Sequence, residues 1–243
     1  MSIIDYGISD NVRLIQERIC SAACRANRSP NDILLIGVTK TIDPERIMLA
    51  YDAGVLEFGE NKAQELVEKY PKVQRECKWH FIGHLQTNKV KAVIDKVKLI
   101  HSLDRLELAE EIDKRARNLE IIMDALVEVN VAAENSKFGI SPDQALEFIK
   151  ALTRFPNLRI QGLMTIAPQV DNAEEVRPVF RELRQLLDHL KKETAGAPNL
   201  DFKYLSMGMS GDYEVAIEEG ANMVRIGSAI FGYRQYPFKE TIN

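Results

Sequence analysis

The chain has 243 residues, of which 45% are hydrophobic and 28% charged, and its formal net charge is −4. This composition is ordinary for a globular protein and long enough for one large domain or two small ones. The slight negative charge, with no run of basic residues interleaved with aromatic ones, argues against a nucleic-acid partner.

The N-terminus carries no targeting signal that we can identify. Residues 1–5 (MSIID) have neither the cationic region nor the apolar region of a secretory signal, and no stretch approaches the length of a membrane span. We therefore expect a cytoplasmic protein that does not associate with membranes.

Short apolar runs alternate with longer amphipathic segments after an expected N-terminal helix at residues 9–27. The runs that predict strands are 33–39, 56–58, 79–82, 99–101, 125–131, 159–164, 203–205 and 223–226. The segments that predict helices are 44–53, 62–70, 87–96, 104–117, 142–153, 172–193, 212–219 and 228–231. About eight β–α alternations predict a parallel sheet covered by helices, either as a closed barrel or as an open doubly wound sheet.

The repeat number favours the closed barrel, that is, a single (β/α)8 TIM barrel with an extra N-terminal helix. An open dinucleotide fold would place Gly-x-Gly-x-x-Gly directly after the first strand, and residues 37–42 (GVTKTI) lack it. No linker rich in proline, glycine or serine divides the chain. We expect one domain over residues 1–243, with its site at the C-terminal ends of the strands.

Polar side chains follow five of the predicted strands. They are Lys40, Asn61, His84, Asn130 and Arg225. An ammonium group at the rim of an apolar core is either paired with an anion or used chemically, because partial desolvation favours the neutral, nucleophilic amine. Taken singly, a strand-end asparagine or histidine is more often a turn former or a satisfied hydrogen-bonding group.

Strand alternation adds a prediction for the fifth strand. Glu128 and Asn130 share one face, and the valines at 127, 129 and 131 share the other. A barrel can place the polar pair inside, near its mouth, and turn the valines towards the helices.

Neither the cysteines nor the histidines indicate a metal site. Cys20, Cys24 and Cys77 are too few and too irregularly spaced for a disulfide scaffold or a zinc site. We expect Cys20 and Cys24 to be small, buried or half-buried helix residues. His80 and His84 have the spacing of a helical metal pair, but the motif's glutamate is missing and the segment is predicted as strand.

The last two strands predict an anion site. Residues 206–212 (SMGMSGD) follow the seventh strand, and Gly227 and Ser228 open a short helix after the eighth. Small residues let backbone N–H groups approach an anion, and the loops after strands seven and eight of such barrels often bind phosphate. Alternatively, residues 206–212 form only a flexible loop.

A ligand with both an aldehyde and a phosphate would suit this arrangement, because closure of the barrel brings strand eight beside strand one. Pyridoxal 5'-phosphate (PLP) has both groups, and its aldehyde forms an imine with lysine. Arg225 is a plausible partner of the pyridine nitrogen. A permanently charged arginine disfavours protonation of that nitrogen, which makes the ring a weaker electron sink.

Seven strings of this sequence together closely resemble the pyridoxal phosphate homeostasis protein family. They are GVTK (37–40), EFGEN (57–61), WHFIGHLQTNK (79–89), NSKFG (135–139), GLM (162–164), LSMGMS (205–210) and VRIGS (224–228). They extend from the first predicted strand to the last, so the resemblance covers essentially the whole chain. It implies a fold-type III PLP barrel related to the N-terminal domain of bacterial alanine racemase.

The resemblance also implies roles for individual residues. Lys40 is expected to form a Schiff base with PLP, and Arg225 to contact the pyridine nitrogen. Phosphate contacts are expected from Ser210, Gly227 and Ser228. The remaining expected pocket residues are Asn61, His84, Met164 and Met207. No residue is assigned a catalytic role and no metal is expected.

Members of the family influence the balance of vitamin B6 forms and of amino and keto acids, without established catalysis. We therefore expect a non-catalytic carrier of PLP, and apo-enzymes that need PLP are candidate partners. The chain ends soon after the last strand with no further domain to build an interface, so we expect a monomer.

The alternative is an amino-acid racemase or another PLP-dependent enzyme. It would need a second acid–base group, for which Tyr204, Tyr213 and Tyr233 are the candidates. A purely interactional role, with the cofactor incidental, also stays open.

Overall fold

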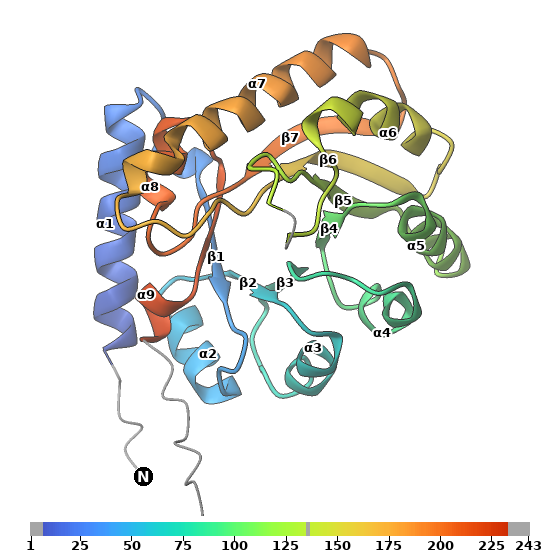
Figure 1. Cartoon of the computed structure of the whole chain (residues 1–243). Helices are drawn as coiled ribbons and strands as arrows, with labels where there is room; N and C mark the ends of the chain where they lie inside the picture. The colour runs from blue at the N-terminus through green and yellow to red at the C-terminus, as the bar shows by residue number, and fades with distance from the viewer. Residues whose placement is uncertain (1–6, 135–136, 233–243) are drawn as a thin grey trace, which may run out of the picture.

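Eight parallel strands close into a barrel in chain order in the computed structural model, which describes residues 7–134 and 137–232 (Figure 1). The strands are β1 (Leu34–Val38), β2 (Glu57–Glu60), β3 (Lys78–Phe81), β4 (Leu99–Leu103), β5 (Met123–Glu128), β6 (Leu158–Met164), β7 (Leu200–Ser206) and β8 (Met223–Ile226). This topology confirms the closed barrel over the open sheet. Part of the NSKFG string, Asn135 and Ser136, and the candidate Tyr233 lie outside the described residues.

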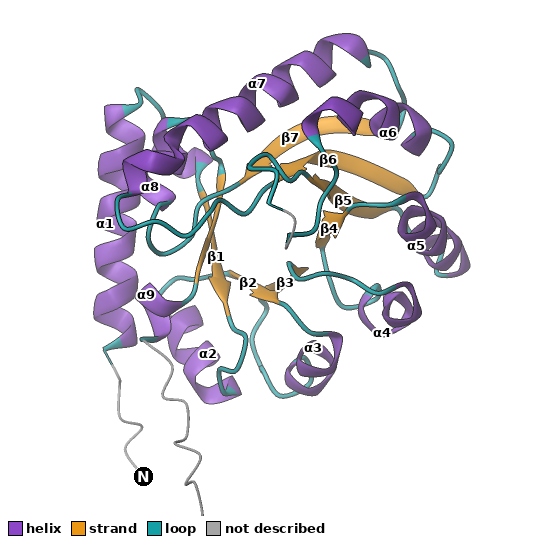
Figure 2. Cartoon of the chain, in the orientation of Figure 1, coloured by secondary structure: helices purple, strands orange, loops and turns teal. Residues whose placement is uncertain are grey.

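Helices surround the ring of strands (Figure 2). They are α1 (Ile8–Arg25), α2 (Pro44–Asp52), α3 (Ala63–Lys69), α4 (Val90–Val93), α5 (Leu106–Asn118), α6 (Ala145–Leu152), α7 (Arg177–Glu193), α8 (Tyr213–Glu218) and α9 (Ser228–Phe231). Before α4, α6 and α7, the first predicted turn is a 3-10 segment, at Thr87–Lys89, Pro142–Gln144 and Ala173–Val176. Such tighter turns are frequent at helix N-termini.

Most strand boundaries differ from the prediction by one or two residues, and two of them, the start of β7 and the end of β5, differ by three. β7 begins at Leu200 because its apolar residues alternate with Asp201 and Lys203, a pattern that hides the strand when only continuous apolar runs are sought. β5 ends at Glu128, and Val129 continues only as an isolated bridge to Ile140.

The predicted extra helix is α1, which packs against α2, α8 and α9 beside the β1–β8 seam (Figure 1). Its buried stripe runs through Ile8, Val12, Ile15, Ile19, Ala22 and Ala23. Cys20 and Cys24 lie off this stripe and are exposed, so the expectation that they are buried or half-buried is wrong. An amphipathic helix buries only one face, and these cysteines lie on the other.

The apolar core has two parts. The larger lies between the strands and the helices and includes the side chains of Val127 and Val129. The smaller consists only of strand residues, Ile36, Leu99, Leu126, Met164 and Met223, which therefore fill the barrel interior. The site lies above this inner core, at the C-terminal ends of the strands.

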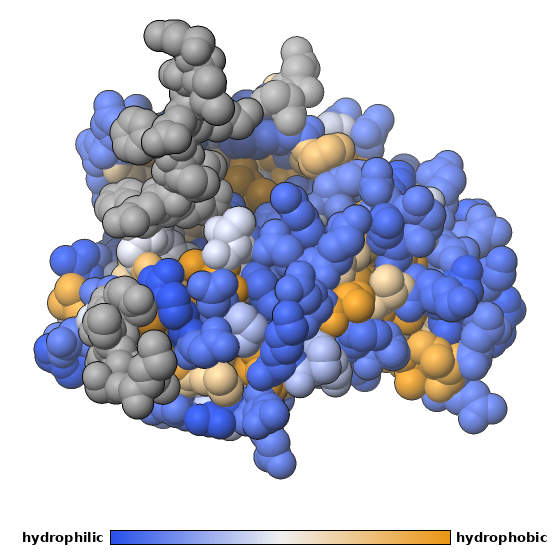
Figure 3. Space-filling model, turned by 90° about the horizontal axis from the view of Figure 1, so that it is seen from below, coloured by the Kyte–Doolittle hydropathy of each residue, from blue (hydrophilic) through white to orange (hydrophobic). Residues whose placement is uncertain are grey.

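The surface is mainly polar on the face shown in Figure 3, where hydrophobic residues occur in small scattered groups. Scattered exposed apolar residues are normal for a folded protein. Among the described residues, no helix is long and apolar enough to cross a membrane.

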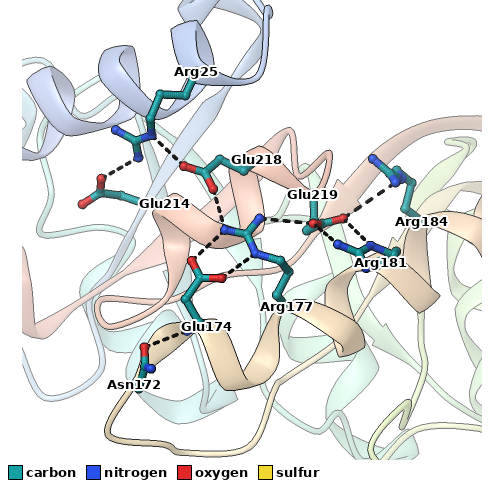
Figure 4. A network of polar contacts seen from close by, with 9 residues as sticks. All are labelled: Arg25, Asn172, Glu174, Arg177, Arg181, Arg184, Glu214, Glu218 and Glu219. Atoms are coloured by element: carbon teal, nitrogen blue, oxygen red, sulfur yellow. Dashed lines mark hydrogen bonds and ion pairs between the residues drawn. The ribbon is translucent and has the colours of Figure 1, made fainter.

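An ion-pair network joins α1, α7 and α8 on the outside of the barrel (Figure 4). Its pairs are Arg25 with Glu214 and Glu218, Arg177 with Glu174, Glu218 and Glu219, and Arg181 and Arg184 with Glu219. α8 follows the loop after β7, so the network fixes the helix that adjoins the predicted anion site.

We expect Glu219→Gln to lower the free energy of unfolding by about 1 kcal/mol at neutral pH. Burial alone would raise the pKa of Glu219, but hydrogen bonds from Arg181 and Arg177 outweigh it, so this pKa is lowered. A carboxyl with a lowered folded-state pKa stabilises the fold above its unfolded pKa and loses this contribution as the pH falls through the folded value. The difference between variant and wild type should therefore shrink below about pH 4.

Urea unfolding at neutral pH and at about pH 3.5 tests this prediction. Glu182→Gln on the neighbouring helix α7 is the control, because Glu182 is exposed and forms no ion pair with the described residues. A stability difference for Glu219→Gln that persists unchanged in acid would contradict the electrostatic explanation.

Candidate functional site

The barrel closes where β8 lies beside β1. Arg225 pairs with Ile36 and Ile226 with Gly37 across this seam, which confirms the predicted adjacency of the first and last strands. Lys40 lies in the turn after β1 and is half-buried. The next residue, Thr41, has a left-handed backbone (φ 64°), which a β-branched residue rarely adopts.

A cavity of about 580 Å³ opens at this end of the seam. It is lined by Val38, Lys40, Ile42, Pro168, Gln169, Val170, Met209, Ser210, Gly211, Asp212, Arg225, Gly227, Ser228, Ala229, Phe231 and Gly232. Its volume is that of a small-molecule site. Five of the predicted cofactor contacts are thus brought together in one lining: Lys40, Ser210, Arg225, Gly227 and Ser228.

The other four predicted contacts are outside this lining. Met164 is fully buried in the inner core, and Met207 is fully buried in the outer core. Asn61 and His84 are half-buried after β2 and β3. Their contacts with a cofactor stay predictions.

The neighbours of His84 are an aromatic ring and a carboxylate, not the cavity. Its ring stacks on that of Phe138, with the centroids 3.8 Å apart and the planes at 16°. Its Nδ1 atom lies 3.5 Å from an oxygen of Asp104. His80 has different partners, so the two histidines do not act as a pair. No three His, Cys, Asp or Glu side chains within the described ranges are grouped so as to hold a metal ion.

The loops after β7 and β8 are joined at the predicted anion site. Ser210 Oγ accepts a hydrogen bond from the backbone N–H of Ala229 at 3.3 Å, and the Met209 N–H donates to Asp212 Oδ1 at 2.6 Å. A Cβ atom on Gly211 would meet nothing within 4 Å, so the lining is open there. The small side chains therefore leave space between two loops that are held together.

The backbone before Lys40 is fixed by a buried ion pair. Lys69 Nζ donates to Thr39 O and to Glu60 Oε1, both at 2.7 Å, and Thr39 Oγ1 donates to the same carboxylate oxygen at 2.7 Å. Glu60 is fully buried, and burial raises the pKa of its carboxyl although Lys69 opposes the shift.

The backbone after Lys40 is also held by Lys69, through Glu65. The N–H of Thr41 donates to Glu65 Oε2 at 2.7 Å, and Lys69 Nζ donates to that atom at 2.9 Å. The ion cluster of Glu60, Glu65 and Lys69 thus holds the chain on both sides of Lys40, including the left-handed turn.

Arg225 lies at the base of the cavity with 4% of its surface exposed. Its NH1 group donates to Ser206 Oγ at 2.7 Å and its NH2 group to the Thr165 carbonyl at 2.9 Å. Burial lowers its pKa to about 10, against the influence of Glu128 and Asp212. The guanidinium therefore remains a cation at neutral pH.

Glu128 is buried on β5, while Val127 and Val129 face the outer core. This confirms the alternation predicted for residues 127–129, but Asn130 lies beyond the end of β5 and does not join Glu128 in the barrel. Burial and the nearby Asp104 raise the pKa of Glu128 to about 7, although Arg225 opposes the shift. The half-buried Asn130 turns to its own loop, where its side chain bonds the backbone of Glu134.

His101 was not predicted as a site residue, and Ser206 and Asp212 were predicted only as part of the anion-binding string 206–212. Ser206 is the last residue of β7, His101 is the third of the five residues of β4, and Asp212 closes the loop after β7. A signal was available for the neighbouring His80, since the alternation Trp79-His80-Phe81 turns the two aromatic residues outward and the histidine inward. Leu205-Ser206-Met207 has the same alternation, with both apolar residues in the outer core and Ser206 between them.

Sequence comparisons place most of this chain in known protein families. Residues 11–235 match the family described as alanine racemase, N-terminal domain. The chain is 49% identical over 223 residues to the pyridoxal phosphate homeostasis protein of Aquifex aeolicus, which covers 91% of this chain and 96% of that protein.

Solved structures of similar chains have the same fold. A protein described as unknown, from Bifidobacterium adolescentis, superposes with a TM-score of 0.88 at 36% identity, covering 95% of this chain and 98% of the other. PipY of Synechococcus elongatus, solved with PLP bound, superposes with a TM-score of 0.77 at 32% identity, covering 90% of this chain and all of PipY.

Proposed function

Because this chain belongs to the pyridoxal phosphate homeostasis protein family, we propose that it binds PLP in the cavity at the β1–β8 seam. We propose further that it holds PLP as an imine on Lys40 and does not turn over a substrate. The observation that carries this proposal is a single cavity of about 580 Å³ lined by a primary amine, a buried guanidinium and small residues. The PLP bound to PipY supports it.

The residues of the cavity fit the cofactor group by group. Lys40 would take the aldehyde, Arg225 the pyridine nitrogen, and Ser210, Gly227 and Ser228 the phosphate. When bound, PLP supplies an aldehyde that condenses with amines and a ring that accepts electron density. A cationic Arg225 disfavours protonation of the pyridine nitrogen, so the ring would be a weaker electron sink than one paired with a carboxylate.

Two of the three tyrosines considered for a racemase, Tyr204 and Tyr213, are not among the residues that line the cavity. Tyr204 packs against the inner core, and Tyr213 is buried in the outer core. Tyr233 lies outside the described residues. These positions favour the carrier over the racemase. A cytoplasmic location, a monomeric state and delivery of PLP to apo-enzymes complete the proposal.

The visible spectrum of the purified protein tests this function. After incubation with PLP and removal of the excess, the protein should be yellow and should gain the mass of reduced pyridoxal phosphate on treatment with borohydride. Peptide mapping should place the added mass on Lys40. A colourless protein without added mass would refute the proposal.

The double variant Ser210→Ala, Ser228→Ala should retain PLP about tenfold less well, because it removes two hydroxyl groups from the proposed phosphate contacts. Its covalent chemistry should persist, since Lys40 is unchanged. Equilibrium dialysis against increasing phosphate measures retention, with Ser141→Ala as a control outside the cavity lining. Retention equal to that of wild type would remove both hydroxyls from the site.

A further inference from the structure

Buried hydrogen bonds run from Arg225 across the barrel interior. Arg225 NH1 lies 2.7 Å from Ser206 Oγ, which lies 3.1 Å from His101 Nδ1. His101 Nε2 lies 2.9 Å from His80 Nδ1, and His80 Nε2 lies 2.6 Å from Glu57 Oε2. All five residues are buried. They come from β8, β7, β4, β3 and β2, so the interactions cross most of the barrel.

The far end lies at the N-terminal ends of the strands. Glu57 is the first residue of β2, and its carboxylate lies 3.3 Å from Lys78 and 3.2 Å from Lys98. Lys78 begins β3 and Lys98 precedes β4, and both side chains are partly exposed. The hydrogen bonds therefore link the cavity to the opposite opening of the barrel.

The groups at the two ends, Arg225 and Glu57, determine which atom donates in each of these hydrogen bonds. A guanidinium only donates, so Ser206 Oγ accepts from Arg225 and its hydroxyl proton can go to His101 Nδ1. His101 then carries its proton on Nε2 and donates to His80 Nδ1. By the same reasoning His80 carries its proton on Nε2 and donates to Glu57.

Glu57 is a suitable final acceptor. Burial would raise the pKa of its carboxyl, but the hydrogen bond from His80 and the hydrogen bond and charge of Lys98 prevail and lower it. The carboxylate is therefore ionised at neutral pH and accepts. An arginine cation at one end and a carboxylate at the other need no charge on the imidazoles between them.

The opposite direction would require an extra proton on His80, so that both of its nitrogens donate. Burial lowers the pKa of His80, and Lys98 and Lys78 add to this effect, whereas Glu57 opposes it. Burial and the charge of Arg225 lower the pKa of His101 well below its ordinary value. Both rings are thus neutral in the physiological range.

We propose that Ser206, His101, His80 and Glu57 are positioning residues that hold the Arg225 guanidinium through a one-way series of hydrogen bonds, with both histidines neutral and protonated on Nε2. The series fixes NH1, and the Thr165 carbonyl fixes NH2. Glu128 and Asp212 act on this cation only through their charge. The effect on the cofactor nitrogen rests on the proposed PLP function, whereas the tautomers follow from the protein alone.

Nitrogen-15 NMR of the histidine rings in PLP-free protein tests the tautomers directly. Both buried rings should give the shifts of neutral, Nε2-protonated imidazole and stay unchanged between about pH 7 and 8, above the ordinary pKa of a solvent-exposed histidine. Variants His80→Gln and His101→Gln assign the signals. A buried ring protonated on Nδ1, or one that titrates in this range, would overturn the proposal.

Ser206→Ala tests the positioning of Arg225, with Ser102→Ala as the matched control. Ser102 is equally buried, and its hydroxyl has no hydrogen-bond partner among the described residues. Ser206→Ala should weaken PLP retention about tenfold, the loss expected for a hydrogen bond to a charged group. It should also change the pH dependence of the visible PLP band. Ser102→Ala should resemble wild type.

Equal retention and equal pH dependence in the two serine variants would refute the positioning role. A wild type that binds no PLP would refute the proposed function instead, and the NMR shifts would still decide the direction of the hydrogen bonds. If Ser206→Ala does not fold, the tautomers of the wild-type protein remain a sufficient test.

Discussion

Lys40→Ala is expected to abolish the covalent PLP complex completely. Lys40 is the one lysine among the described residues that line the cavity, and an imine cannot form without its amine. The variant should show no added mass after borohydride treatment and no visible band from a lysine-bound cofactor. Arg225 and the small-residue loops are unchanged, so weak noncovalent binding of PLP should remain.

Two further variants separate nucleophilicity from charge. Lys40→Arg keeps a cation but offers no amine of suitable pKa, so it should also lack the covalent complex. Lys62→Ala removes an exposed lysine outside the cavity lining and should behave as wild type. Full labelling of Lys40→Ala, or of Lys40→Arg, would show that another lysine binds the aldehyde.

The seam of the barrel could be predicted from the sequence because its signals are local. The apolar run before Lys40 marks β1, and the glycine–serine turn after Arg225 marks the end of β8. About eight β–α alternations then require the two strands to meet if the sheet closes. For these reasons Lys40, Ser210, Arg225, Gly227 and Ser228 were predicted together, and the structure brings them to one cavity.

The interior of the barrel could not be predicted in the same way. The contact of Ser206 with His101 joins residues 105 positions apart, and it depends on strand register, which no local pattern encodes. Whether a residue near a strand end faces the cavity or the outer core could not be predicted either. Met207 follows β7 by one residue, yet it packs into the outer core instead of the cavity. A shift of one residue along a strand reverses the face to which a side chain points.

The burial of charged residues in short strands also could not be predicted from hydrophobicity. Glu57 and Glu60 lie in a four-residue strand whose residues are all buried. Their partners, His80 and Lys69, come from a later strand and a later helix, so burial of these carboxylates is stable only in the assembled barrel.

Lys69→Met should show how strongly the site depends on such a buried pair. The substitution leaves the fully buried Glu60 carboxylate without its cation, and it releases Thr39 O and Glu65. Removal of one partner from a buried ion pair costs about 3–5 kcal/mol, far more than loss of an exposed pair. Urea unfolding at pH 7 measures this cost. Lys72→Met, which breaks an exposed pair with Glu68, should cost less than about 1 kcal/mol.

The double variant Lys69→Met, Glu60→Gln should recover part of the loss, because no buried charge is then left unpaired. In Lys69→Met alone, Glu60 has a folded-state pKa above its unfolded value. Its folded form is then favoured by protonation, so stability is lost as the pH rises through the folded-state pKa and regained on acidification. The single variant should therefore gain stability relative to wild type from about pH 7 to 5, and no such gain would mean that Glu60 is not the source of the cost.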